Sequence, residues 1–182
     1  MKKVMLIGDS IRMSYQAAVR KRLADVAEVW GPDDNCRFVK YTLWNVAAWL
    51  NQCGQPDVIH WNNGIWDVYR QNQEMGIFTS LEEYAADLKR VLRELRRTGA
   101  QVIWATTTPV KPECLTCRNE DIAKYNAEAV RIMTAEQVAT NDLNCLLMAD
   151  LNGFISQDNV HLSEAGVEAC GEAVARMILK YL

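Results

Sequence analysis

The sequence predicts an α/β fold: a single-domain, three-layer αβα sandwich around a five-stranded parallel sheet. Short apolar segments recur along the chain, and each is followed by a longer stretch in which apolar residues have helical spacing. The alternation continues without an internal repeat or a low-complexity linker. Strands that alternate with helices form a parallel sheet covered on both faces and joined by right-handed crossovers. We therefore treat residues 1–182, which are 49% hydrophobic, as one domain.

Five brief apolar runs are the expected strands, because such runs are typical of strands buried on both faces. The clearest helical pattern covers residues 81–97, where Ser80 and Glu83 form a capping-box pattern and Gly99 can close the helix. We expect the flavodoxin-like strand order 2-1-3-4-5. The expected strands are residues 4–7, 27–30, 58–61, 102–106 and 137–139, and the weaker helical patterns are residues 15–25, 42–53, 121–136 and the segment from Ser163.

This strand order also predicts where a ligand binds. Ligands of such sheets bind outside the carboxyl ends of the strands, where the winding direction reverses, here between the first and third strands. The loops at that point are Gly8-Asp9-Ser10 and residues 62–67. The first loop lacks the glycines or P-loop lysine that cradle a phosphate, which disfavours a nucleotide-binding function.

Composition and charge disfavour other classes of function. The 20 basic and 23 acidic residues give a net charge of −3, so no large positive field attracts nucleic acid or an anionic membrane. No apolar stretch reaches the roughly 18 residues of a membrane span. The apolar run at residues 4–7 is too short for a secretory signal. We expect a soluble, cytoplasmic protein, and the sequence leaves its oligomeric state open.

The cysteines are too sparse and irregular for a secreted disulfide scaffold, so we expect reduced thiols. Cys114 and Cys117 form a CxxC pattern, which can be a redox pair or half of a zinc site. No second ligand pair is visible, and we expect neither a metal nor another cofactor. The surrounding loop, residues 109–119, follows the fourth strand and is a candidate wall for a pocket at its end.

Ser10 is a candidate nucleophile if a base can remove its proton, and the usual base is a histidine oriented by a carboxylate. Of the two histidines, His60 lies in the third predicted strand and is expected to be a hydrogen-bonded core residue. His161 lies in a polar loop before the last helix, three residues after Asp158. At this spacing the carboxylate can reach Nδ1 and leave Nε2 for the serine. An Asx turn beside an exposed histidine is the alternative for this pair alone.

Gly8-Asp9-Ser10 near the start and Asp158-x-x-His161 near the end resemble the SGNH/GDSL hydrolase superfamily, which includes lipases, acylhydrolases and esterases. The predicted α/β order of strands and helices agrees with that family over nearly the whole chain. The resemblance implies a serine hydrolase that cleaves an ester through an acyl-enzyme. Ser10 would be the nucleophile, His161 the base and Asp158 its partner. The tryptophan-rich loops favour a small acyl group, such as acetate, on a carbohydrate or another polar carrier.

The resemblance also implies an oxyanion hole formed by the Ser10 N–H, a glycine and an asparagine. Lys40 stands where the glycine is expected, and its backbone N–H can still donate. Gly31 is a second candidate for this donor.

Tryptophan stands where the family has asparagine, because the third block reads Gly64-Ile65-Trp66-Asp67. The Trp66 indole N–H is one possible third donor, and the side chain of Asn62 or Asn63 is another. Trp66 can instead serve only as a pocket wall.

Two residues beside Ser10 complete the candidate site. Asp9 is expected to hold the loop through backbone hydrogen bonds. Arg12 can clamp a carboxylate or sulfate of the substrate, or it can be a solvated charge in the first turn of a helix. The departures at Lys40 and Trp66 leave one alternative open, which is a non-catalytic ligand-binding domain on the same fold.

Overall fold

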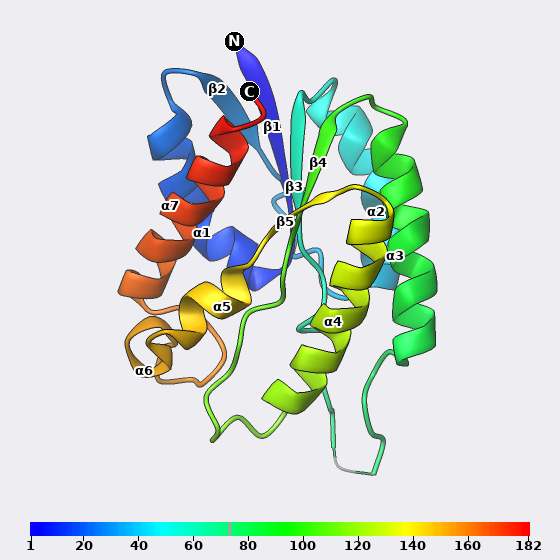
Figure 1. Cartoon of the computed structure of the whole chain (residues 1–182), viewed down its shortest axis with the longest axis vertical. Coiled ribbons are helices and arrows are strands. Elements are labelled where there is room, and N and C mark those ends of the chain that lie inside the picture. Colours follow the sequence, from blue (N-terminus) through cyan, green and yellow to red (C-terminus); the bar gives the residue numbers. More distant parts are fainter. Residues whose placement is uncertain (73) are drawn as a thin grey trace.

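A computed structural model describes residues 1–72 and 74–182 of the chain. Its five strands form one parallel sheet in the order β2-β1-β3-β4-β5 (Figure 1). The predicted α/β class and strand order are therefore confirmed. The strands are β1 (Lys2–Ile7), β2 (Ala27–Trp30), β3 (Val58–Trp61), β4 (Gln101–Ala105) and β5 (Ala139–Asn141).

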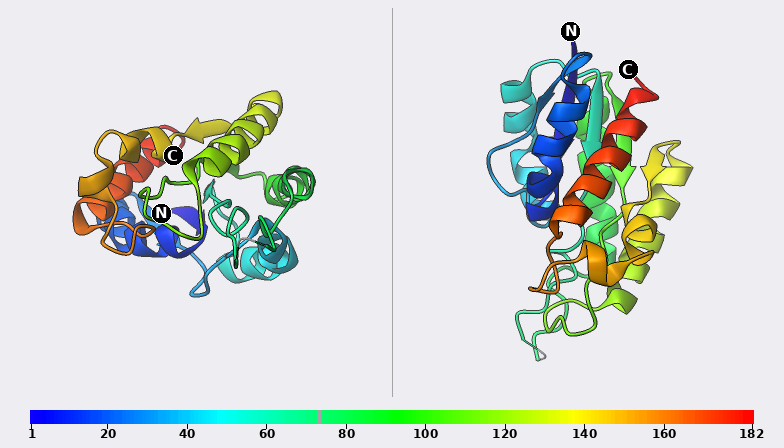
Figure 2. Two further views of the ribbon diagram at one scale, coloured as in Figure 1. Left: turned by 90° about the horizontal axis from the view of Figure 1, so that it is seen from below. Right: turned by 90° about the vertical axis from the view of Figure 1, so that its left-hand side faces the viewer.

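Helices cover both faces of the sheet. One layer holds α1 (Ser10–Leu23) and α7 (Glu164–Leu179), which lie side by side (Figures 1 and 2). The opposite layer holds α2 (Val39–Cys53), α3 (Leu81–Arg96) and α4 (Asn119–Ala135). Alternate residues of a strand point to opposite faces, so Val4 and Leu6 pack with α1 and α7 while Met5 and Ile7 pack in the other core.

Several element boundaries differ from the prediction. The helix expected from residue 15 begins at Ser10, because the Asp9 carboxylate accepts the Ile11 N–H at 2.9 Å and caps it. The last strand covers 139–141 rather than 137–139, since Gln137 has a left-handed φ of 56°. Two short helices, α5 (Leu143–Met148) and α6 (Leu151–Phe154), were not predicted. The predicted caps at Ser80 and Ser163 are confirmed.

Two findings bear on the expectations from composition. All six cysteines are free thiols: Cys36, Cys53, Cys114, Cys117, Cys145 and Cys170. Among the residues that the structure describes, none of the helices has both the length and the apolar composition needed to cross a bilayer.

Arg12 joins the loops that follow β1 and β2, and only 1% of it is exposed. Its guanidinium donates to the carbonyls of Gly8 at 3.2 Å, Pro32 at 3.0 Å and Asp34 at 2.9 Å. The expectation of a substrate clamp or a solvated charge is therefore corrected. Because α1 already begins at Ser10, the Arg12 side chain runs back toward the helix start and under the loops.

We predict that Arg12→Met lowers the free energy of unfolding by about 3 kcal/mol or more, since it leaves several buried carbonyls without their charged donor. Urea denaturation measures the change. Lys21→Met, at an exposed position of the same helix, is the matched control and should shift stability by at most about 0.5 kcal/mol. Equal midpoints for the two variants would contradict the bracing role.

Candidate active site

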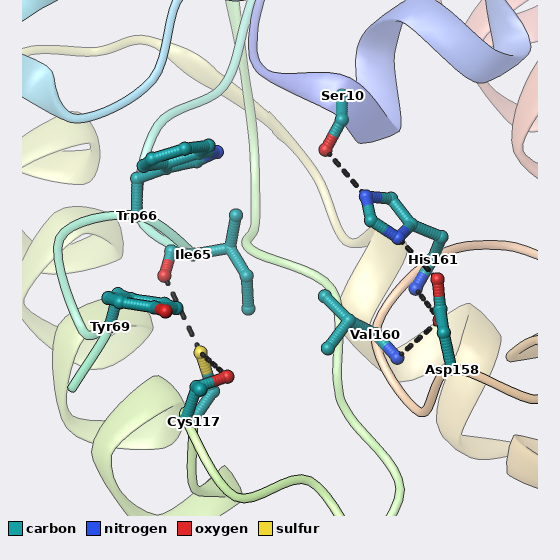
Figure 3. A pocket seen from close by; sticks show the side chains of 9 residues that line it. Ser10, Ile65, Trp66, Tyr69, Cys117, Asp158, Val160 and His161 are labelled. Carbon is teal, nitrogen blue, oxygen red and sulfur yellow. Dashed lines mark hydrogen bonds and ion pairs between the residues drawn. The ribbon is translucent and has the colours of Figure 1, made fainter. Parts of the chain in front are cut away.

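The side chains of Ser10, His161 and Asp158 lie next to one another, as Figure 3 shows. Ser10 is the first residue of α1, directly after β1 and its short loop. The Ser10 Oγ lies 3.0 Å from His161 Nε2, and His161 Nδ1 lies 2.6 Å from Asp158 Oδ2. Residues 151 positions apart in the sequence are thereby joined in one hydrogen-bonded chain.

A tight turn before α7 holds the histidine in place. The Ser156 N–H donates to the His161 carbonyl at 2.7 Å, and the Ser163 N–H donates to the Phe154 carbonyl at 2.9 Å. Asn159 adopts a left-handed φ of 70°, a conformation that asparagine tolerates better than most residues. The turn reverses the direction of the chain, so that the Asp158 carboxylate lies within hydrogen-bond distance of the His161 ring.

Asp158 accepts several hydrogen bonds. Partial burial raises the pKa of this carboxyl, but hydrogen bonds from the backbone N–H groups of Val160 and His161, from the Ser156 hydroxyl and from the His161 ring outweigh that effect, so its pKa is lowered. The carboxylate is therefore ionised at neutral pH. An ionised acceptor at Nδ1 favours the tautomer with its proton there and leaves the Nε2 lone pair toward Ser10.

The second histidine does not take part in this arrangement. His60 is buried in β3, where its Nε2 lies 3.2 Å from the Asn141 amide nitrogen and its ring packs edge-on against Tyr15. Burial lowers the pKa of His60 to about 3, so the ring is neutral at physiological pH. The prediction that His60 is a hydrogen-bonded core residue is confirmed.

The start of α1 provides a positive electrostatic environment beside the Ser10 hydroxyl. N–H groups in the first turn of a helix have no acceptor within the helix, and their dipoles favour negative charge. Asp9 takes the Ile11 N–H, as expected for a residue that holds this loop. The Ser10 N–H is the preceding donor of the same turn.

A pocket of about 390 Å³ opens beside Ser10 and His161. Trp66 and Tyr69 form one wall, with their ring planes 26° apart and their centroids 6.2 Å apart. In Figure 3 the indole nitrogen of Trp66 is on the side of the ring that faces Ser10. The pocket is lined by Ser10, Ile65, Trp66, Tyr69, Thr116, Cys117, Asp158, Val160 and His161.

The two asparagines at the end of β3 use their amides inside the protein. The Asn62 amide nitrogen donates to the Ala105 carbonyl at 2.9 Å. Asn63 donates to the Arg37 carbonyl at 2.9 Å and accepts the Trp61 indole N–H at 2.7 Å. Neither asparagine is among the residues that line the pocket. Both therefore brace the loops around it, and Trp66 is the member of this segment that reaches the pocket.

Gly64 sets the course of the chain toward Trp66. Its φ is 152°, and a Cβ built on it would lie 1.9 Å from the Thr107 Oγ1, so no side chain fits there. The close approach to Thr107 places the next residues, Ile65 and Trp66, in the pocket wall.

The ammonium group and the backbone N–H of Lys40 have different surroundings. The ammonium points to α3, 3.5 Å from a Glu83 oxygen and 3.8 Å from an Asp87 oxygen. The backbone N–H belongs to the first turn of α2, where it lacks an acceptor within the helix. Gly31, the other candidate for this donor, is packed instead: a Cβ there would lie 2.9 Å from the Leu6 carbonyl oxygen.

Three residues of the pocket wall were not predicted from the sequence. Ile65, Tyr69 and Val160 carry no chemical signal, although each is within three residues of a candidate residue. Thr116 and Cys117 belong to the loop after β4 that was a candidate wall, and the structure places both in the lining. The thiol of Cys117 contacts the Ile65 carbonyl oxygen at 3.7 Å.

No protein-family model and no curated protein matches the sequence. Solved structures do match. The acetyl xylan esterase AlAXEase has a TM-score of 0.83 at 17% identity, over 97% of this chain and 99% of the other. Axe2, an acetylxylan esterase from Geobacillus stearothermophilus, has a TM-score of 0.80 at 21% identity, over 97% and 94%. A lipase/acylhydrolase from Enterococcus faecalis has a TM-score of 0.75 at 20% identity, over 98% and 95%.

The chain has the SGNH/GDSL hydrolase fold. These three matches cover 94 to 99% of each chain, so the shared feature is the complete sheet with its helices rather than a local motif. The predicted resemblance is thereby confirmed for this fold. At identities of 17 to 21% the likeness establishes architecture, and the roles of individual residues depend on the geometry described above.

The burial of Asp9 predicts a pH dependence of stability. Burial raises the pKa of Asp9 to about 6, although the Ile11 N–H and the charges of Arg12 and His161 oppose the rise. The folded protein then binds this proton more tightly than the unfolded chain, so stability is lost as the pH rises from about 4 through about 6.

Asp9→Asn keeps an acceptor for the Ile11 N–H and removes the titration. We therefore expect its free energy of unfolding, relative to wild type, to rise by about 1–3 kcal/mol between pH 4 and pH 7. Urea denaturation across this range measures the difference. Asp25→Asn, at an exposed position, is the control. A wild-type and an Asp9→Asn profile that run parallel would contradict the burial effect.

Proposed function

We propose that this protein is a serine esterase, a carboxylic ester hydrolase of the SGNH/GDSL superfamily. The observation that carries the proposal is the hydrogen-bonded chain from Ser10 Oγ through His161 to Asp158, with distances of 3.0 and 2.6 Å. Nucleophile, base and orienting carboxylate within hydrogen-bond reach are the arrangement that activates a serine. The adjoining pocket and the helix start at Ser10 support it.

The mechanism follows from these positions. Ser10 Oγ attacks the ester carbonyl carbon while His161 Nε2 accepts its proton, and the Asp158 carboxylate stabilises the imidazolium. The tetrahedral intermediate collapses when His161 protonates the departing alcohol oxygen, which leaves an acyl group on Ser10. Water then attacks the acyl carbon with His161 as base, and the acid leaves as Ser10 regains its proton.

The proposed oxyanion hole combines one backbone donor with one side chain. The Ser10 N–H belongs to the first turn of α1, where the helix dipole favours negative charge. Lys40 does not line the pocket and instead lines a hollow between α2 and α3, so its N–H is not part of the proposal. The Trp66 indole N–H is the proposed second donor, because Trp66 lines the pocket while the amides of Asn62 and Asn63 bond elsewhere. A tryptophan would thus replace the asparagine of the family pattern.

The proposed substrate is a small acyl group, such as acetate, on a carbohydrate or another polar carrier. Two of the solved structures with this fold are described as acetyl xylan esterases, which supports the choice of an acetyl ester. The stacked Trp66 and Tyr69 rings give the pocket a flat aromatic wall, a surface suited to the apolar face of a sugar ring.

Hydrolysis of 4-nitrophenyl acetate tests the proposed reaction. Ser10→Ala should remove turnover above the solvent rate, and Asp158→Asn should lower kcat by about 10³- to 10⁴-fold, because the histidine loses its oriented tautomer. Ser14→Ala is the matched control, since this hydroxyl donates to the Ile11 carbonyl at 2.7 Å, one turn earlier in the helix. Full turnover by Ser10→Ala would sink the proposal. A folded wild type without turnover would favour the non-catalytic binding domain.

Trp66→Phe tests the proposed side-chain donor of the oxyanion hole, because it keeps an aromatic wall and removes the indole N–H. If that N–H binds the oxyanion, kcat falls by about 10²- to 10³-fold while KM changes little. Steady-state kinetics on the same substrate measure both constants, and Tyr69→Phe, which retains its ring in the wall, is the control. An unchanged kcat in Trp66→Phe means that Trp66 is a wall and that another group meets the oxyanion.

A further inference from the structure

A second hollow lies against the wall that Trp66 and Tyr69 form beside the proposed catalytic pocket. Its volume is about 190 Å³, and it is lined by Phe38, Trp66, Tyr69, Gln71 and Phe78. Trp66 and Tyr69 line both hollows, so the two spaces are separated by one pair of stacked rings. Figure 3 shows these rings beside the space in front of Ser10. The second hollow therefore adjoins the space in which a molecule at Ser10 would lie.

Hydrogen bonds hold the walls of this hollow in place. The Phe78 N–H donates to the Tyr69 carbonyl at 2.9 Å, which links two positions of the loop after β3. The carboxyl group of Asp67 accepts the Val39 N–H at 3.1 and 3.2 Å, next to Phe38. These bonds fix the main chain on two sides of the hollow.

The lining indicates the chemistry of the occupant. The Phe38 and Phe78 rings are 4.8 Å apart at 49°, and Phe78 is 58% exposed, so much of its side chain is accessible to an incoming group. Aromatic rings prefer tilted or offset contacts with other rings. An apolar cavity of about 150 Å³ suffices to bind benzene in another protein, so a six-membered ring fits the space.

A sugar ring fits this lining less well than an aromatic ring does. Carbohydrate hydroxyls need several hydrogen-bonding partners, and burying a hydroxyl without one is costly. Among the lining side chains, the polar groups are the Gln71 amide, the Tyr69 hydroxyl and the Trp66 indole N–H. The last of these faces the Ser10 side in Figure 3.

We propose that this hollow, the Phe78 subsite, binds an aromatic ring carried by the alcohol portion of the ester substrate. The inference rests on the proposed esterase function, in which an acetyl group of two carbons is too short to pass the Trp66–Tyr69 wall. The ring therefore belongs to the alcohol. The substrate class is an acetate ester of a polar carrier that also bears an aromatic ring, joined by a linker long enough to pass the wall.

Matched acetate esters test the Phe78 subsite, because every ester in the set gives the same acetyl-enzyme. The set pairs ethyl, butyl and hexyl acetate with 2-phenylethyl, 4-phenylbutyl and 6-phenylhexyl acetate. In wild type the phenyl group should raise kcat/KM by about 5- to 10-fold at one linker length, mainly through KM. Phe78→Ala should remove that gain and leave the kinetics of ethyl acetate unchanged. Phe78→Tyr should restore it.

Met75→Ala is the matched control, since Met75 is exposed in the same loop and does not line the hollow. Calorimetry with 4-phenylbutanol gives a readout that does not require turnover. Tighter binding of this alcohol to wild type than to Phe78→Ala supports the subsite whether or not any ester is hydrolysed. A lack of ester hydrolysis beside such binding would refute the proposed function and leave the subsite standing. Equal phenyl gains in wild type and Phe78→Ala, or hydrolysis of ethyl acetate without any phenyl gain, would overturn the subsite.

Discussion

The arrangement of the candidate site depends on where α1 begins. The buried Asp9 carboxylate accepts the Ile11 N–H, so the helix starts at Ser10, directly after β1. This start places the serine hydroxyl at the carboxyl edge of the sheet and its N–H at the positive end of a helix. The burial that raises the pKa of Asp9 is the cost of this cap. If α1 began a turn later, neither the serine nor its N–H would have this position.

Two buried side chains connect that helix start to the neighbouring loops. Arg12 donates to carbonyls in the loops after β1 and β2, and Asp67 accepts the first N–H of α2 from the loop after β3. The walls around Ser10 are therefore braced by the protein's own hydrogen bonds. Preorganised donors need no rearrangement as charge develops on a substrate, which is the condition for strong electrostatic stabilisation.

The sequence was sufficient to predict the topology and the pairing of distant residues. Alternating short and long apolar patterns indicated a parallel sheet, and its carboxyl edge brings Ser10 and His161 together however far apart they are in the chain. Local patterns also indicated the capping box at Ser80 and the cap at Ser163. These features depend on residue types at fixed spacing, which one sequence displays directly.

The direction of individual side chains could not be predicted in the same way. Arg12 turns under the loops because α1 starts early, and Asn63 turns inward because the Arg37 carbonyl and the Trp61 indole are its partners. Each outcome depends on contacts between segments that are distant in the sequence. The short helices α5 and α6 were missed for a related reason, since six and four residues are too few to show helical periodicity.

The most direct test of the central claim is whether Ser10 is an activated nucleophile. A fluorophosphonate reacts with a serine whose proton is taken by a neighbouring base, and intact-mass analysis counts the adducts on each chain. We expect one adduct per wild-type chain, located at Ser10 by peptide mapping, and none in Ser10→Ala or His161→Ala. A folded wild type that stays unlabelled while a control hydrolase reacts would contradict it.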